Sequence, residues 1–181
     1  MGVGVGVGVG ETGPVFSVEV LPDAATEAEI VGQWQRLVEA GLSSAGRHPS
    51  PSNRPHVTLA VRDHLEPAGV AALADALPLE LRLGGAVVFA AGERFVLARQ
   101  VVVSRALLAL HAEALRVVGP PPERYAVTAA DRWSPHVTLA RRMTGDQVGA
   151  ALAVVGAAPL DGRLDGLRVW DATERVVTTL R

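Results

Sequence analysis

The hexapeptide Pro-His-Val-Thr-Leu-Ala occupies residues 55–60 and recurs, letter for letter, at residues 135–140. A chance match of this length between two unrelated windows of one chain has a probability on the order of one in a thousand. The two copies therefore indicate an internal duplication, or a function that requires the same residues twice. Their separation of 80 residues, in a chain of 181, predicts two halves of similar size.

Each copy of the hexapeptide is rich in β-forming residues and should lie on a strand. Side chains two positions apart on a strand point to the same face, so His56 projects with Thr58, and His136 with Thr138. The alternate valine and leucine side chains turn the other way, into a core. If an approximate two-fold axis relates the two strands, two imidazoles and two hydroxyls surround one small volume, which suits a phosphate.

Two histidines around a phosphate can act as a base and an acid. An unperturbed imidazole has a pKa of about 6.5, so one copy can be neutral while the other is protonated near neutral pH. The neutral imidazole would activate the attacking water, and the protonated one would protonate the departing ribose oxygen. The threonine hydroxyls would donate to the non-bridging phosphoryl oxygens. This chemistry requires no metal and no other cofactor.

The paired His-x-Thr strands resemble the motifs of the 2H phosphoesterase superfamily, in particular its bacterial 2′-5′ RNA ligase and RNA cyclic phosphodiesterase branch. The resemblance covers the chain from about Val15 onward. It implies a bilobal α+β fold, in which two antiparallel sheets with pseudo-two-fold symmetry flank a central cleft and the helices lie outside. It also implies hydrolysis of 2′,3′-cyclic phosphates, commonly to 2′-phosphates, with reversible 2′-5′ RNA ligation in some members.

The order of expected elements repeats roughly once per half. Residues 14–181 should form a single bilobal domain, whereas the strict Gly/Val alternation of Met1 to Gly10 predicts that residues 1–13 form a disordered tail. Strands are expected at 15–21, 54–61, 79–90, 94–103, 133–141, 160–170 and 175–180, and helices at 23–40, 68–77, 105–118 and 144–155.

Composition excludes several classes of function. The chain has no lysine, so all 17 positive side chains are arginines, and nucleotidyl-lysine ligases, Schiff-base enzymes and Walker-A NTPases are excluded in their usual form. The absence of cysteine excludes disulfides, thiolate metal sites and a cysteine nucleophile. Arginine usage with abundant Ala, Gly and Val favours a GC-rich bacterial source.

The net charge of −2 argues against binding along an extended nucleic-acid backbone, but allows a terminal phosphate. The expected partner is therefore an RNA 3′ terminus or a cyclic nucleotide. No apolar run approaches the length of about 18 residues that a membrane span needs, and the start lacks the pattern of a signal peptide. We expect a cytoplasmic monomer that does not bind membranes.

Arginines and aromatic residues beside the motifs are candidates for binding the substrate. Arg54 precedes His56 by two residues and should share its face, and the same parity favours Arg142 over Arg141 as a phosphate ligand unless the strand bends at its end. Trp133 and Phe95, with Phe89 as a further candidate, could stack on a base, although aromatic residues at such positions are more often part of the core.

The remaining histidines have other expected roles. His111 falls on the apolar stripe of its helix and should be packed, His64 should be solvated, and His48 could line the cleft. Neither motif has a carboxylate at metal-ligand spacing, which leaves a cluster with Asp63 or Asp131 as a minor alternative. Three further interpretations stay open: a ligase or transferase, a nucleotide- or RNA-end-binding module, and a duplicated structural unit.

Overall fold

The computed structural model describes residues 15–156 and 158–181, so the predicted tail at 1–13 lies outside the described residues. The predicted α+β class is confirmed, and the predicted helix at 68–77 is divided into a short α-helix and a 3₁₀ helix. The strands are β1 (Phe16–Pro22), β2 (Val57–Arg62), β3 (Leu79–Ala91), β4 (Arg94–Val101), β5 (His136–Met143), β6 (Leu160–Asp171) and β7 (Val176–Thr179). The helices are α1 (Ala24–Glu39), α2 (Pro67–Val70), α3 (Arg105–Val118) and α4 (Gly145–Val155), with 3₁₀ helices η1 (Ala45–Arg47), η2 (Ala71–Ala76) and η3 (Glu123–Thr128).

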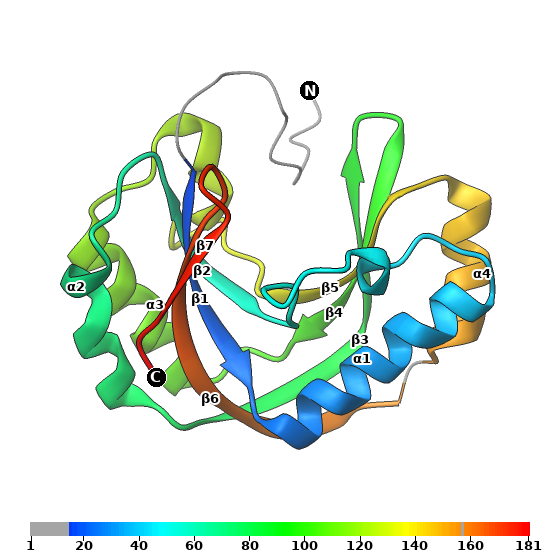
Figure 1. Cartoon of the computed structure of the whole chain (residues 1–181), viewed down its shortest axis with the longest axis horizontal. Helices are drawn as coiled ribbons and strands as arrows, with labels where there is room; N and C mark the ends of the chain where they lie inside the picture. The colour runs from blue at the N-terminus through cyan, green and yellow to red at the C-terminus, as the bar shows by residue number, and fades with distance from the viewer. Residues whose placement is uncertain (1–14, 157) are drawn as a thin grey trace.

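All strand pairs are antiparallel, in the order β2-β1-β6-β3-β4-β5, and β7 pairs with β6. The long strand β6 connects the two halves, because its first residues pair with β3 and its later residues pair with β1. The two expected sheets are thus joined at their base, and the joined sheet curves upward on both sides (Figure 1). This curvature brings its end strands, β2 and β5, into contact. These are the strands that carry the repeated hexapeptide.

Each half is covered in part by one helix that follows a strand of the other half. Helix α1 leaves β1 and packs with α4 on the side of β4 and β5, whereas α3 leaves β4 and packs on β2 (Figure 1). The same order of elements therefore occurs twice: strand, helix, motif strand, helix, strand. In each occurrence the first helix packs on the other half. Within residues 15–156 and 158–181, no helix has the length and apolar character needed to cross a membrane.

Local signals in the sequence fix the ends of α1 and α4. Asp23 caps α1 by accepting a hydrogen bond from the Thr26 backbone amide at 3.0 Å, and Thr144 forms a capping box with Gln147. Strand β6 passes so close to the start of α1 that a Cβ at Gly162 would lie 1.8 Å from the Thr26 hydroxyl oxygen. Only glycine fits there without moving α1, which carries one side of the candidate site.

Candidate active site

The predicted alternation of the motif strands is confirmed by burial. Val57, Leu59, Val137 and Leu139 are fully buried in one hydrophobic core that spans both halves. Because neighbouring positions on a strand face opposite ways, the histidine and threonine side chains of the motifs are directed away from that core.

The two motif histidines are held in the same way. His56 Nδ1 lies 2.8 Å from the carbonyl oxygen of Arg54, and His136 Nδ1 lies 2.7 Å from the carbonyl oxygen of Ser134. A carbonyl can only accept, so each Nδ1 carries a hydrogen and donates it. Each ring therefore has a fixed orientation and leaves Nε2 available for proton transfer.

Two tryptophans bind the motif strands from opposite directions. Trp34 Nε1, on α1, donates to the carbonyl oxygen of Thr138 at 3.0 Å, and Trp133 Nε1, just before β5, donates to the carbonyl oxygen of Thr58, also at 3.0 Å. Strands β2 and β5 end the sheet, so these carbonyls have no further strand beside them. The two indoles satisfy them, and the bond from Trp133 connects the two motif strands directly.

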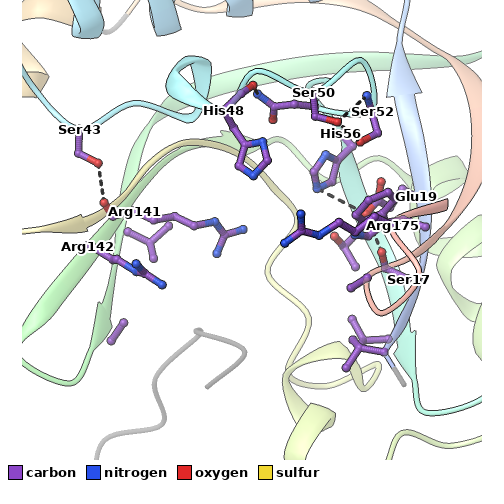
Figure 2. Close-up of a pocket in the computed structure, with 18 of the residues that line it drawn as sticks. Ser17, Glu19, Ser43, His48, Ser50, Ser52, His56, Arg141, Arg142 and Arg175 are labelled. Carbon is purple, nitrogen blue, oxygen red and sulfur yellow. Dashed lines mark hydrogen bonds and ion pairs between the residues drawn. The ribbon is translucent and has the colours of Figure 1, made fainter. Parts of the chain in front are cut away.

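A large open cavity of about 1700 Å³ lies in the cleft above the motif strands (Figure 2). Its lining includes His56 and Thr58. A smaller cavity of about 80 Å³ shares His56 and Arg141 with the larger one and is also lined by Thr138. His136 lines neither cavity. Its ring lies against Phe89 on β3, with ring centroids 4.7 Å apart. The larger cavity exceeds a single phosphate many times in volume, so it has room for more of a substrate than its reacting group.

A buried carboxylate beside His56 is the main feature that sequence reasoning missed. Glu19 Oε1 on β1 lies 3.6 Å from His56 Nε2 and accepts a hydrogen bond from the Ser17 hydroxyl at 2.6 Å, while Oε2 accepts one from Arg168 Nε at 2.7 Å. Burial alone would raise the pKa of Glu19, but the charges of His56 and Arg168 and these hydrogen bonds hold it below its ordinary value. Glu19 is therefore a carboxylate at neutral pH. Its sequence signal was a pair of polar residues, Ser17 and Glu19, on one face of an apolar strand.

Within residues 15–156 and 158–181, no carboxylate lies within ion-pair distance of His136. Glu19 pairs with Thr58 across β1 and β2, and the corresponding partner of Thr138 across β4 and β5 is Ala98. Burial is the main reason why the pKa of His136 is lowered, and the charges of Arg141 and His56 lower it further against the opposing effect of the bond to the Ser134 carbonyl. The environment therefore favours a neutral His136, whereas a buried carboxylate lies beside His56.

The model of the 2′-5′ RNA ligase superfamily matches residues 22–175, which include both motif strands. The chain belongs to the 2′-5′ RNA ligase superfamily. The resemblance to 2H phosphoesterases that the two motifs indicated is thereby confirmed. No curated protein sequence matches the chain at a significant level.

The fold of this superfamily member is similar to two solved bacterial structures. The first is TT0787 of Thermus thermophilus, with a TM-score of 0.54, 19% sequence identity, and coverage of 94% of this chain and 96% of that one. The second is LigT of E. coli in its apo form, with a TM-score of 0.53, 15% identity, and coverage of 94% and 96%. These similarities support the bilobal 2H phosphoesterase fold.

The predicted phosphate-binding arginines have different positions in this superfamily member. Arg141 lines both cavities, and its Nη2 donates to the Thr138 hydroxyl at 3.3 Å. Arg142 lines the larger cavity as well. Between Ala140 and Met143, β5 has one more residue than the part of β4 that pairs with it, and Arg142 in this bulge has a φ of 59°. A β-bulge of this kind changes the direction of side chains, so alternation does not choose between the two arginines.

The structure does not place Arg54 in the cleft. Strand β2 begins only at Val57, so strand parity does not apply to Arg54. Its guanidinium instead binds Glu27 on α1 through two hydrogen bonds of 2.9 and 2.5 Å, and it lines neither cavity.

Trp133 and Phe95, the candidates for base stacking, both have the packing role that is more common for aromatic residues at such positions. Trp133 stacks on His111 at a centroid distance of 3.8 Å, behind the motif strands. Phe95 packs against the core, since its neighbour Val96 faces the cleft. An aromatic residue that sequence reasoning did not single out, Trp170 on β6, lines the larger cavity.

The positions of the other histidines agree with the expectations from the sequence, and they bear on the alternative of a metal site. His111 is 2% exposed and lies 3.1 Å from the Thr128 carbonyl oxygen, His64 is exposed beside Glu66, and His48 lines the cleft. Across the described part of the chain, no three His, Cys, Asp or Glu side chains gather to hold a metal ion. Asp63 forms an ion pair with Arg124.

Proposed function

We propose that this protein hydrolyses 2′,3′-cyclic phosphates, at RNA 3′ ends or on small nucleotides, by acid/base catalysis with His56 and His136 and without a metal. One observation carries the proposal. Two identical motifs present two tethered imidazoles, and the carboxylate of Glu19 lies beside only one of them, 3.6 Å from His56 Nε2. The equivalent position on β4 is alanine, so two chemically identical groups have different electrostatic surroundings.

This asymmetry assigns the roles. Neutral His136 accepts a proton from water through Nε2 as the water oxygen attacks phosphorus. Protonated His56 donates its Nε2 proton to the departing ribose oxygen as the P–O bond breaks, so that the ring opens to a phosphate monoester with a free hydroxyl. The hydroxyls of Thr58 and Thr138 and the guanidinium of Arg141 stabilise the charge that builds on the non-bridging oxygens.

A related reaction uses the same groups. If a hydroxyl of a second RNA end takes the place of water, its oxygen attacks phosphorus, the ribose P–O bond of the ring breaks, and the two RNA ends are joined by a phosphodiester. This is the activity that gives the superfamily its name. A nucleotide-binding module with little turnover is the other alternative, and it predicts binding without product.

The decisive assay is incubation with the four nucleoside 2′,3′-cyclic phosphates in excess EDTA. We expect turnover with chelator present, because neither motif, within the residues described, has a cluster of metal ligands nearby. His64→Ala is the matched control, since His64 is exposed beside Glu66 and should not affect the rate. Activity that disappears with EDTA and returns only with a divalent metal would contradict the mechanism, and binding without turnover at any pH would support the binding module.

A further inference from the structure

Positive charge is concentrated in the cleft although the chain carries a net charge of −2. Glu19 is the one carboxylate that lines the cleft among the residues the structure describes, and Arg168 neutralises it at 2.7 Å. Within those residues, no carboxylate lies within ion-pair distance of the other arginines in the lining, which are Arg94, Arg141, Arg142 and Arg175. A concave surface with one sign of charge attracts anionic ligands strongly.

Three of these arginines lie beyond the reacting groups, toward the cleft mouth. The β3–β4 turn, which precedes Arg94, and the β6–β7 turn, which contains Arg175, rise on opposite sides of the molecule (Figure 1). Arg142 lies in the bulge of β5. Figure 2 shows Arg141 and Arg142 extending into the cleft from one side and Arg175 from the other. An anionic chain leaving the reacting site would therefore pass between them.

The backbone holds two of these arginines in a disfavoured conformation. Arg142 has a φ of 59° and Arg175 a φ of 56°, and no other non-glycine residue in the described ranges has a positive φ. Residues other than glycine rarely adopt this backbone conformation, and such strained residues cluster at functional sites. Both residues line the cleft, so each of the two strained positions presents a guanidinium group to the same cavity.

Strand register places an aromatic side chain between the reacting site and this outer part of the cleft. Arg168 pairs with Glu19 across β6 and β1, and Trp170 pairs with Ser17, two residues further toward the turn that contains Arg175. Trp170 is partly buried and lines the cleft. An indole beside cationic side chains is how proteins bind single-stranded nucleic acid, by stacking on a base while the cations contact phosphate.

We propose that Trp170, Arg142 and Arg175 form a subsite for the nucleotide that precedes the terminal cyclic phosphate. The indole stacks on the base of that nucleotide, and the two guanidinium groups bind the phosphodiester that joins it to the reacting nucleotide. The inference rests on the proposed function and makes it more specific: the substrate is an oligoribonucleotide end, and a free nucleoside cyclic phosphate fills only the inner part of the cleft.

The test compares uridine 2′,3′-cyclic phosphate with the dinucleotide adenylyl-uridine 2′,3′-cyclic phosphate. We expect kcat/KM for the dinucleotide to be at least about tenfold higher, the usual worth of one stacked base. Arg175→Gln should lower the dinucleotide value about two- to fivefold and leave the mononucleotide value unchanged, and Arg142→Gln should lower the dinucleotide value by more than the mononucleotide value. Arg175→Gln should also reduce the slope of log kcat/KM against log salt by about 0.7 for the dinucleotide alone.

Two controls isolate the role of the charge in the cleft. Arg175→Lys should restore the salt slope. Arg105 is an exposed residue on α3, so Arg105→Gln should change kcat/KM for neither substrate. Equal kcat/KM values for the two substrates, or equal losses on both in the arginine variants, would overturn the subsite.

A binding measurement separates this inference from the proposed reaction. A fluorescently labelled trinucleotide that ends in a 2′-phosphate cannot be opened further, so its affinity does not depend on turnover. Weaker binding in both glutamine variants supports the subsite even if neither cyclic phosphate is hydrolysed, in which case the proposed reaction alone fails. Unchanged binding overturns the subsite even if both substrates are hydrolysed.

Discussion

The substitution Glu19→Gln removes a charge from one side of the candidate active site while nearly preserving shape. Glu19 lies 3.6 Å from His56 Nε2, and its carboxylate is held by Ser17 and Arg168. In the proposed mechanism His56 must be protonated and His136 neutral. The loss of the negative charge should therefore reduce activity on the alkaline side of the pH profile, where the proton on His56 is lost.

The size of the effect follows from distance and exposure. Two unit charges about 4 Å apart interact by about 1 kcal/mol in water and about 4 kcal/mol at the effective dielectric of a protein surface. The His56 side chain is 30% exposed and Glu19 only 4%, so solvent screens the pair in part. We expect an effect of about 1 to 2 kcal/mol, which corresponds to a loss of kcat/KM of about five- to thirtyfold on the alkaline side of the profile.

The assay is a pH profile of kcat/KM on a cyclic phosphate, in which the wild type should give a bell whose two limbs belong to the coupled histidine pair. Ser17→Ala is the matched control, because it removes a hydrogen bond to Glu19 and keeps the charge. Glu19→Gln alone leaves Arg168 buried without its carboxylate, so the double variant Glu19→Gln/Arg168→Gln serves as a second test in which no cation is left unpaired. An alkaline limb that stays in place, or an acid limb that moves instead, would refute the assignment of His56 as the acid.

Three other predictions test the same site and its supports. His56→Ala and His136→Ala should each reduce kcat by about 10²- to 10⁴-fold, and the double variant should lose much less than the product if the pair acts as a unit, as steady-state kinetics would show. Trp34→Phe and Trp133→Phe each remove an indole donor from a motif-strand carbonyl, so denaturant titration should show a loss of about 1 to 3 kcal/mol in unfolding free energy, accompanied by lower kcat. Burial lowers the pKa of His111, so the stability that His111 contributes is present above about pH 6.5 and is lost as pH falls. The drop in Tm between about pH 7.5 and 5.5 should therefore be smaller in His111→Gln than in the wild type. It should not be abolished, because the pKa of His136 is lowered too.

Much of the fold could be predicted from the sequence because the signals are local. The first five residues of the hexapeptide alternate apolar and polar side chains, so the buried faces at Val57 and Val137 follow from strand geometry alone. Asp23 and Thr144 are strong N-caps, and the starts of α1 and α4 agree with the prediction within one residue. His111 could be placed in the core because its helix has a clear apolar stripe.

The predictions that differ from the structure concern residues whose positions depend on contacts between elements distant in the sequence. Arg54 was placed on the face of His56 by alternation, but β2 begins after it, and Glu27 on a different element pairs with it. Trp133 was a candidate for base stacking because it is near the motif in sequence, yet the packing of α3 behind β2 places His111 against its ring. No local pattern specifies either contact.

Glu19 shows what a repeated motif cannot reveal. The duplicated hexapeptide supplies two histidines with the same tether, and by itself gives no reason for one to be the acid and the other the base. That difference comes from β1 and β4, the strands beside the motifs, where Glu19 and Ala98 occupy equivalent positions. The proposed acid/base catalysis by two identical groups requires their environments to differ. In that mechanism the residues that decide the direction of proton transfer lie outside the repeat, at positions where the two halves have diverged.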